Sequence, residues 1–278
     1  MLVGVSLLPL MNTFAKSLAS EYPLWQVVFA RFTGHLVWMT LLFFPRRGID
    51  LFRTGRPTLQ LTRSGIFFVS NAAFISALPT IPLATASAIM FTTPILVTAL
   101  SVPLLGERVG IYRWGAVLLG FGGTLVIIQP GTELFNFSAV MVLGSAGCFA
   151  FYQITTRTLT QTESAETLII YTALVGAGIT LCLLPWVGQW PSSSADMLSF
   201  LAVGLVGGLA QYCIVRALER APASVISPIG YAELVSATLF GLVVFGDFPA
   251  ATTWYGAALI ILSGLAITYR ESKRSTGR

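Results

Sequence analysis

Apolar residues run along the chain in ten long stretches that are separated by short segments of polar, charged or turn-forming residues. Each stretch approaches the roughly 20 residues that an α-helix needs to cross the hydrocarbon core of a bilayer. The pattern therefore predicts ten membrane-spanning helices, with nine or eleven as the competing counts. Their expected ranges are 1–19, 23–44, 62–79, 83–105, 109–128, 136–157, 166–187, 197–217, 222–245 and 250–269.

Prolines mark the breaks in this pattern. Pro79 and Pro82 lie in the short segment between the third and fourth stretches, so we expect a tight connection there, because proline ends one helix and fits the start of the next. Pro94 and Pro228 lie inside the fourth and ninth stretches, where each can bend its helix. A hinge and a fixed kink both remain open at these two positions.

Composition agrees with a surface that faces lipid. Hydrophobic residues make up 55% of the 278 residues and charged residues only 10%, whereas a soluble domain carries about 25% charged residues. Cys148, Cys182 and Cys213 lie in apolar runs without metal-site or disulfide spacing, so we interpret them as packing residues. The first stretch lacks the basic start and cleavage site of a signal peptide and is expected to be a spanning helix.

The basic residues predict the orientation of the helices. With a cytoplasmic N-terminus, 14 of the 16 Lys and Arg residues fall in cytoplasmic segments or at the cytoplasmic ends of the spans, and the other two, Lys16 and Arg31, lie elsewhere within spans. Cytoplasmic loops retain Lys and Arg, so both termini are expected in the cytoplasm. The net charge of +5 then reflects membrane topology, and the expected environment is a lipid bilayer without nucleic acid as a partner.

The chain also repeats itself. Residues 77–114 and 217–254 align without a gap at an offset of 140, with eight identities in 38 positions. A period of about 140 residues gives five helices per half, and an odd number makes the second half inverted in the membrane. We therefore predict an all-α membrane protein with two inverted five-helix repeats, residues 1–131 and 132–278, around a central cavity near the midplane. The identical pairs are Ala77/Ala217, Leu78/Leu218, Pro82/Pro222, Ser87/Ser227, Ile89/Ile229, Thr98/Thr238, Gly106/Gly246 and Trp114/Trp254.

At these residues the chain resembles the drug/metabolite transporter superfamily, in particular its EamA-type ten-helix members. The shared features are the two halves, Lys16 near the end of the first helix, Arg31 in Ala30-Arg31-Phe32, and two turns that precede a Trp, namely Gly106-Glu107-Arg108 and Gly246-Asp247. The Glu-Pro pair that is frequent on helix nine of such proteins is incomplete, because Leu234 follows Glu233 and Thr93 precedes Pro94. Within the family, the chain looks most like bacterial amino-acid exporters, including exporters of aromatic amino acids.

Glu233 is the strongest candidate for a functional residue. It lies about 12 residues into the ninth span, roughly 18 Å deep at 1.5 Å per residue and therefore near the bilayer centre. A carboxylate at that depth costs about 2.5–3.5 kcal/mol and usually faces an interior or a cavity. One interpretation is a counter-ion for a substrate ammonium or a protonatable gate, and the other is a structural link, protonated or paired with Lys16 or Arg31.

Three basic or titratable residues are candidates for gating or for structure. Arg31 and His35 are four residues apart and share one face of the second span. Arg31 can bind a carboxylate or anchor two helices, whereas His35 is expected to be a packing residue more than a proton relay. Lys16 is expected to extend its ammonium to the outer interface and to have an architectural role, with Arg157 as its repeat counterpart.

The family resemblance implies that spans three, four, eight and nine line the cavity. It therefore favours substrate contact for polar and aromatic residues of these spans, with interhelical hydrogen bonding or packing as the alternative. These residues are Asn71, Phe74, Ser87, Phe91, Gln211, Tyr212 and Tyr231, together with Glu233. Gly204 and Gly208 are expected to allow close helix packing, and Glu107 and Asp247 to order helix ends.

These observations predict an exporter of small organic metabolites in the bacterial inner membrane that works by alternating access. Amino acids, aromatic or otherwise apolar, are the favoured substrates, and cationic drugs or other metabolites are the alternative. An intramembrane enzyme is a remote alternative, because H-E-x-x-H, G-x-S-x-G and phosphate-binding P-loop motifs are absent from the sequence. We expect no cofactor, no metal ion, and a monomer or weak oligomer.

Overall fold

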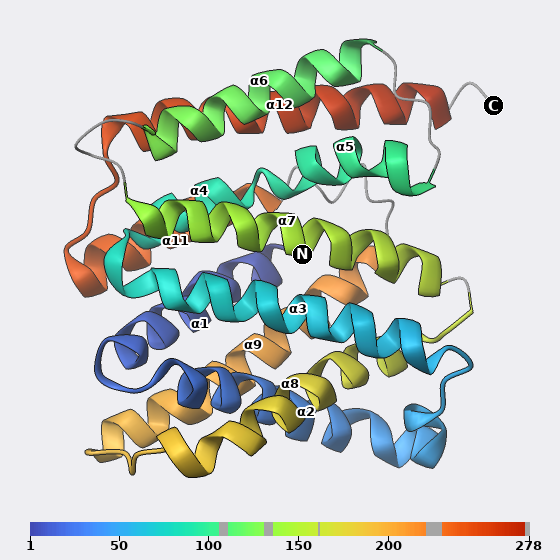
Figure 1. Cartoon of the computed structure of the whole chain (residues 1–278), viewed down its shortest axis with the longest axis vertical. Helices are drawn as coiled ribbons and strands as arrows, with labels where there is room; N and C mark the ends of the chain where they lie inside the picture. The colour runs from blue at the N-terminus through green and yellow to red at the C-terminus, as the bar shows by residue number, and fades with distance from the viewer. Residues whose placement is uncertain (106–110, 131–135, 161, 221–229, 276–278) are drawn as a thin grey trace.

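The computed structural model of the chain describes residues 1–105, 111–130, 136–160, 162–220 and 230–275. These residues form helices that lie side by side in one bundle, connected by short segments (Figure 1). The α-helices are α1 (Leu2–Glu21), α2 (Leu24–Arg47), α3 (Pro57–Ala77), α4 (Leu83–Met90), α5 (Thr93–Leu105), α6 (Ile111–Ile128), α7 (Phe137–Leu159), α8 (Ala165–Val187), α9 (Ser194–Arg220), α11 (Ala232–Phe245) and α12 (Ala251–Ser275). Two short 3₁₀ helices, η1 (Gly48–Phe52) and η2 (Leu78–Thr80), follow α2 and α3.

The apolar helices coincide with the ten stretches expected from the sequence. Seven of the described helical segments are long and apolar enough to cross a bilayer. Three shorter apolar helices, Trp114–Ile128, Ala232–Phe245 and Ala251–Ala266, lie at the expected fifth, ninth and tenth spans. The prediction of an all-α membrane protein is therefore confirmed.

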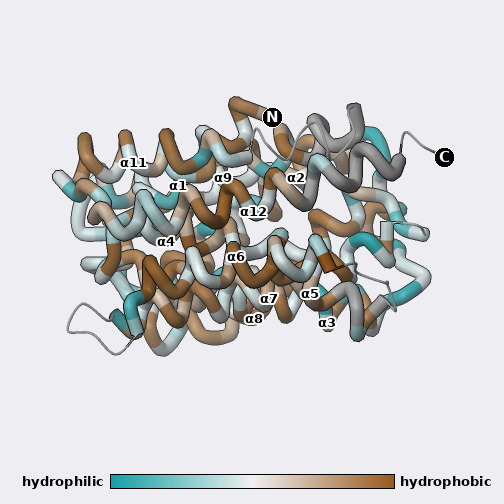
Figure 2. The backbone as a smooth tube through the Cα atoms, turned by 90° about the horizontal axis from the view of Figure 1, so that it is seen from above, coloured by the Kyte–Doolittle hydropathy of each residue, from teal (hydrophilic) through white to brown (hydrophobic). Residues whose placement is uncertain are grey.

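The connections between helices collect at the two ends of the bundle. In Figure 1, the α2–α3 and α7–α8 connections and the C-terminus lie at one end, and the α1–α2, α8–α9 and α11–α12 connections lie at the other. Figure 2 shows hydrophilic residues gathered at these ends and hydrophobic residues covering the middle. The segments expected to carry most basic residues thus share one end, and the assignment of that end to the cytoplasm stays a prediction.

The expected fourth span is two helices. α4 ends at Met90 and α5 begins at Thr93, with Phe91 and Thr92 in the turn between them. Pro94 occupies the first turn of α5, where its missing N–H breaks no helical hydrogen bond. In the second half, Tyr231 lies in a turn directly before α11, and it is the repeat counterpart of Phe91. Pro228, the other expected bending point, lies outside the described residues.

The packing of helices follows the expected repeat. α6 packs along α12 at one edge of the bundle and α2 along α8 toward the opposite edge (Figure 1). α1 packs along α9, as α3 does along α7, and α2 packs along α9, as α3 does along α8. In the expected repeat α1, α2 and α3 correspond to α7, α8 and α9. The contact of α1 with α9 therefore corresponds to that of α7 with α3, and the contact of α2 with α9 to that of α8 with α3. The boundary between the halves at residues 131 and 132 stays a prediction.

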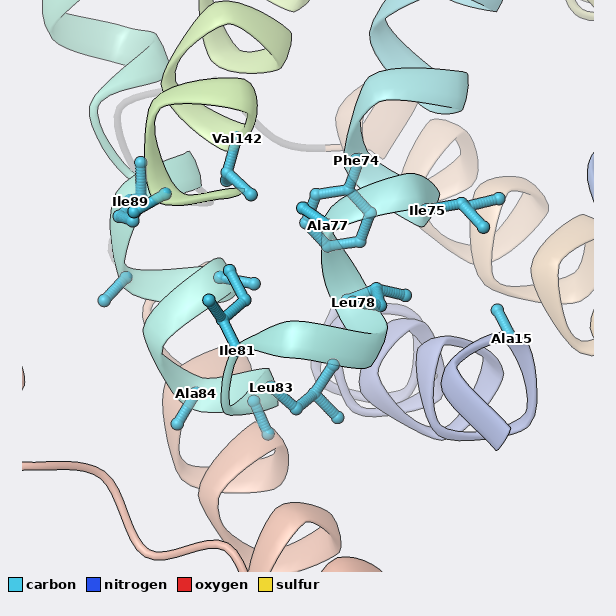
Figure 3. Packing of buried hydrophobic residues seen from close by; sticks show 14 of the residues in the cluster. Ala15, Phe74, Ile75, Ala77, Leu78, Ile81, Leu83, Ala84, Ile89 and Val142 are labelled. Atoms are coloured by element: carbon cyan, nitrogen blue, oxygen red, sulfur yellow. The ribbon is translucent and has the colours of Figure 1, made fainter. Parts of the chain in front are cut away.

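The main apolar core runs through most of the bundle, and the part of it shown in Figure 3 lies where α3, α4 and α7 meet near α1. Leu78, Leu83 and Ile89 are fully buried there, and Val142 contributes from α7 (Figure 3). The tight connection expected between the third and fourth spans is present as η2. Asn136, the N-cap of α7, donates from its side chain to the carbonyl of Thr80 and fixes this connection against α7. The core thereby buries α4 up to the turn at Phe91.

Candidate substrate site

Glu233 meets Ser87 across the interface between α4 and α11. Glu233 lies in the first turn of α11, and its Oε1 accepts a hydrogen bond of 3.4 Å from the hydroxyl of Ser87. Ser87 is 1% exposed, in the last turn of α4. The first turn of a helix favours negative charge, because its N–H groups have no helical acceptors. Two residues expected at the site from the sequence are thus in direct contact.

Two further expected residues lie at the neighbouring turns. The rings of Phe91 and Tyr231 have centroids 5.2 Å apart and an interplanar angle of 87°, which is an edge-to-face contact. The hydroxyl of Tyr231 reaches α12, where a Cβ added at Gly264 would overlap it. We call Ser87, Phe91, Tyr231 and Glu233 the break-point cluster, because they gather where both repeat-related segments turn.

Thr93 extends the break-point cluster on the side of α5. It is the repeat counterpart of Glu233 and likewise stands at the start of a helix that follows a turn. Its side chain is 3% exposed, and its hydroxyl oxygen has no hydrogen-bond partner in the structure. Polar groups with spare hydrogen-bonding capacity therefore stand at both repeat-related helix starts.

Lys16 forms an ion pair with Asp247 and not with Glu233. Its ammonium donates 2.6 Å to Asp247 Oδ2 and 3.0 Å to the carbonyl of Ile81, and it lies 4.7 Å from the centre of the Phe245 ring. The side chain is only 7% exposed, so the ammonium lies at the end of the bundle that is expected to be outer but is buried there, and its architectural role stays a prediction. A nearby carboxylate lets the ammonium stay inside, where it joins α1 to the ends of η2 and α11.

Arg31 donates hydrogen bonds to Asn71. With the Asn71 amide oriented so that its oxygen faces the guanidinium, Oδ1 accepts from Arg31 Nη2 at 3.1 Å and from Nε at 3.2 Å. This contact links α2 to α3. Ion pairs between the described residues do not include Arg31 or Glu233. Ser87 is accordingly the hydrogen-bond partner that the described residues provide to Glu233, and neither cation proposed for Glu233 pairs with it.

The structure places Phe74 and Tyr212 away from the break-point cluster. Phe74 lies within the main apolar core of Figure 3, and it is 9% exposed. Tyr212 packs its ring 5.9 Å from that of Phe43, in a second apolar cluster with Met39 and Ile170. Gln211 precedes Tyr212 on α9 and is partly buried. These positions favour packing over substrate contact for Phe74 and Tyr212.

The two glycines expected to allow close packing do so. A Cβ at Gly204 would lie 2.5 Å from the Cα of Gly34, so the backbones of α9 and α2 touch at this crossing. One turn later, a Cβ at Gly208 would contact Trp38 at 3.1 Å and His35 at 3.6 Å. His35 therefore faces α9 at its crossing with α2.

Arg63 is a structural residue that the sequence placed in a cytoplasmic segment. It is completely buried in α3, and its guanidinium lies 4.7 Å from the centre of the Tyr152 ring. Its hydrogen bonds of 2.8–3.3 Å reach the side-chain oxygens of Gln60, Tyr152, Thr156 and Thr172 and the carbonyl of Leu168. They connect α3 to α7 and α8. Tyr152 and Thr156 are one helical turn apart and so share a face of α7, and this pair of hydroxyls is the sequence feature that could have indicated a buried donor on a neighbouring helix.

The described residues offer no group of three or more His, Cys, Asp or Glu side chains that could hold a metal ion. What the arrangement offers is one carboxylate without a cationic partner, two aromatic rings and several hydroxyls inside a helical bundle. Such a set can bind an organic solute by stacking and hydrogen bonding.

Comparisons with known proteins identify similar sequences and a similar fold. The EamA-like transporter family matches residues 1–129 and 136–269. A riboflavin transporter of Vibrio cholerae is 33% identical over 195 residues, which are 70% of this chain and 65% of that protein. An S-adenosylmethionine uptake transporter of Rickettsia felis is 29% identical over 98% of this chain and 93% of that protein. A crystal structure with 20% identity has a TM-score of 0.66 over 98% of this chain and 97% of its own, which shows a shared fold.

Proposed function

The chain belongs to the EamA-like transporter family, and from this premise we propose that it carries small organic metabolites with a flat heterocyclic ring across the bacterial inner membrane. As a member of that family it is a multi-pass membrane transporter and not an enzyme. The proposal adds the class of substrate, the site and the mode of transport. Alternating access, with two five-helix halves closing one end of a central site while opening the other, is the proposed mode.

The names of the relatives support heterocyclic metabolites over amino acids. The Vibrio cholerae relative is named for riboflavin and the Rickettsia felis relative for S-adenosylmethionine. Both compounds contain a flat heteroaromatic ring with several hydrogen-bonding groups. The export of aromatic amino acids that the sequence predicted has no counterpart in these names, and the Rickettsia relative is named for uptake. We therefore retain transport and leave its direction to the experiment below.

The break-point cluster supports the location of the site. The observation that carries the proposal is the position of Glu233 at the start of α11, with Ser87 as partner and without a cation. A carboxylate inside a membrane protein is costly, so it requires a function or a partner. Phe91 and Tyr231 provide aromatic faces beside it. A flat ring stacked there can donate a ring or amino N–H to the carboxylate.

Two matching turns support alternating access. Interrupted helices at corresponding places in two repeats mark the binding site of many transporters, because half-helices can move relative to one another. The α4–α5 turn and the turn before α11 lie at aligned positions, and their rings touch. The symmetric packing of α1 with α9 and of α3 with α7 agrees with two halves that rock against each other.

Counterflow in proteoliposomes tests this function. Vesicles loaded with unlabelled riboflavin, S-adenosylmethionine, phenylalanine or a cationic dye are diluted into the same labelled compound. We expect wild-type protein to accumulate labelled riboflavin or S-adenosylmethionine above protein-free vesicles. Counterflow of phenylalanine or of the dye alone would contradict the proposed substrate class. The same vesicles are then given a proton gradient or a membrane potential. The gradient that changes how the labelled compound is distributed across the membrane shows the direction of transport.

A further inference from the structure

Two ring nitrogens on α2 are buried without hydrogen-bond partners. They are Nε2 of His35 and Nε1 of Trp38. A buried polar atom without a partner costs free energy and is uncommon in native structures. Trp38 Nε1 can only donate, whereas His35 Nε2 can donate or accept according to its tautomer. A ligand could therefore form two hydrogen bonds here. Trp38 can donate to an acceptor of the ligand, and His35 can bond to a neighbouring donor or acceptor.

A ring carbon bonded to each nitrogen lies beside the same point on α9. A Cβ built on Gly208 would lie 3.1 Å from Trp38 Cδ1 and 3.6 Å from His35 Cδ2. Each of these carbons is bonded directly to the nitrogen in question. Both nitrogens thus lie within about one bond length of atoms that surround the same point. The absence of a side chain at Gly208 leaves that point to the two rings.

The crossing that covers the nitrogens consists of backbone and small residues. Gly34 and Gly204 touch one turn before, and a Cβ on either would collide with the other helix. The atoms nearest to each added Cβ belong to the backbone of the other helix, so the two helices pack backbone against backbone at the crossing that covers the rings. Arg31 stands on the same face of α2, because residues 31, 35 and 38 follow helical spacing. This face of α2 carries hydrogen-bond donors, and neither Arg31 nor His35 takes part in an ion pair between described residues.

We propose that His35 and Trp38 form a second subsite of the transporter, which binds the amide-like edge of a heterocyclic substrate and is closed in this conformation by the α2–α9 crossing. A ring carbonyl accepts from the Trp38 indole N–H, and the neighbouring ring nitrogen pairs with His35. Opening of the crossing exchanges two unmade hydrogen bonds for bonds to substrate. This subsite rests on the proposed substrate class, and it adds residues remote from Glu233 in sequence.

Binding of riboflavin to the purified protein tests the subsite. Trp38→Phe keeps an aromatic ring for packing and removes the donor. We expect it to raise the Kd of riboflavin at least tenfold, while the melting temperature of the ligand-free protein stays equal or rises. A riboflavin analogue methylated at its ring imide nitrogen cannot pair with His35, and its methyl group holds the ring edge away from Trp38, so it should bind wild type and Trp38→Phe with a much smaller difference. Trp25→Phe, on the same helix, is the control and should leave the Kd within twofold.

A purely structural role for Trp38 gives a different result. In that case Trp38→Phe changes only the melting temperature, and a Kd within twofold of wild type overturns the subsite. Gly208→Ala is the second variant, because its methyl group occupies the point between the rings, and it should also raise the Kd. S-adenosylmethionine replaces riboflavin as the probe if only it binds, because its adenine offers a ring nitrogen that accepts from the Trp38 indole N–H and a neighbouring amino group that donates to His35. If wild type binds neither compound, the proposed substrate class fails first, and the subsite fails with it.

Discussion

Three cations inside the bundle meet their hydrogen-bonding needs in different ways. Lys16 uses a carboxylate and a carbonyl, Arg31 uses an amide oxygen, and Arg63 uses neutral oxygens from three helices. Burial of a charge is tolerated when its donors are satisfied. Because these partners are supplied from within the protein, none of the three cations pairs with Glu233, and the ion pairs between described residues do not include it. The residue-level pattern therefore separates structural cations from the carboxylate of the site.

Replacement of Arg63 should destabilise the protein without a direct effect on substrate contact. Arg63→Leu leaves several buried oxygens of α7 and α8 without donors, and we expect a loss of about 2–4 kcal/mol in unfolding free energy. The measurement is thermal unfolding in detergent, with Arg53→Leu as the control. Arg53 is 76% exposed and pairs only with Asp50 among the described residues, so its replacement should change little. Equal melting temperatures for wild type and Arg63→Leu would contradict this assignment.

The sequence identified candidate residues of the proposed site but not their contacts. Ser87 and Glu233 were both candidates, yet their hydrogen bond joins positions 146 residues apart, which no local pattern encodes. Arg63 was assigned to a cytoplasmic segment, because a count of basic residues near helix ends cannot separate an exposed arginine from a buried one. Its partners on α7 and α8 become visible only when the helices are packed.

For the helices, the sequence predicted which segments are helical better than it predicted the residues at which each helix begins and ends. Pro94 predicted a bend, and the structure has a full break there. α3 begins at Pro57, five residues before the expected start, and its first turns contain Gln60, Arg63 and Ser64, all completely buried. These polar residues lower the hydropathy of the segment although they face the interior. The apolar run therefore starts later than the helix.

The α2–α9 crossing should be sensitive to a single methyl group. Alanine normally stabilises a helix by about 0.5–1 kcal/mol relative to glycine. At Gly204 the added Cβ would meet Gly34, so Gly204→Ala should lower the melting temperature by several degrees. Gly147→Ala is the matched control, because a Cβ there meets nothing within 4 Å, and its melting temperature should stay equal or rise. If both variants behave alike, the two helices do not touch as the structure has them.

At the scale of the whole molecule, the apolar pattern and the repeat predicted more than any single motif did. The family match covers residues 1–129 and 136–269, and the helix contacts exchange as the offset of 140 predicts. Substrate identity did not follow from the sequence, because a cavity of aromatic rings and one carboxylate suits many solutes. Amino acids were expected, whereas the names of relatives favour heterocyclic compounds.

The topology of the bundle can be measured with single cysteines in a protein whose three native cysteines are replaced. Asp196→Cys near the α8–α9 connection should react with an impermeant thiol reagent added to intact cells. Arg53→Cys near the α2–α3 connection should react only after permeabilisation, because basic segments stay in the cytoplasm. The reverse labelling pattern would place the termini outside and contradict the orientation.

Counterflow by Glu233→Gln tests whether the carboxylate at the start of α11, which has Ser87 as its partner among the described residues, carries the transport function. Glutamine keeps the shape and can still accept from Ser87, but it removes the charge and the titratable proton. We predict that the variant reaches the membrane, melts within a few degrees of wild type and loses at least tenfold in the counterflow rate of whichever heterocycle wild type exchanges. Glu166→Gln, which removes a carboxylate paired with Arg47, should retain wild-type counterflow. A stable Glu233→Gln protein with wild-type counterflow would show that Glu233 is a structural hydrogen-bonding residue and would contradict the account.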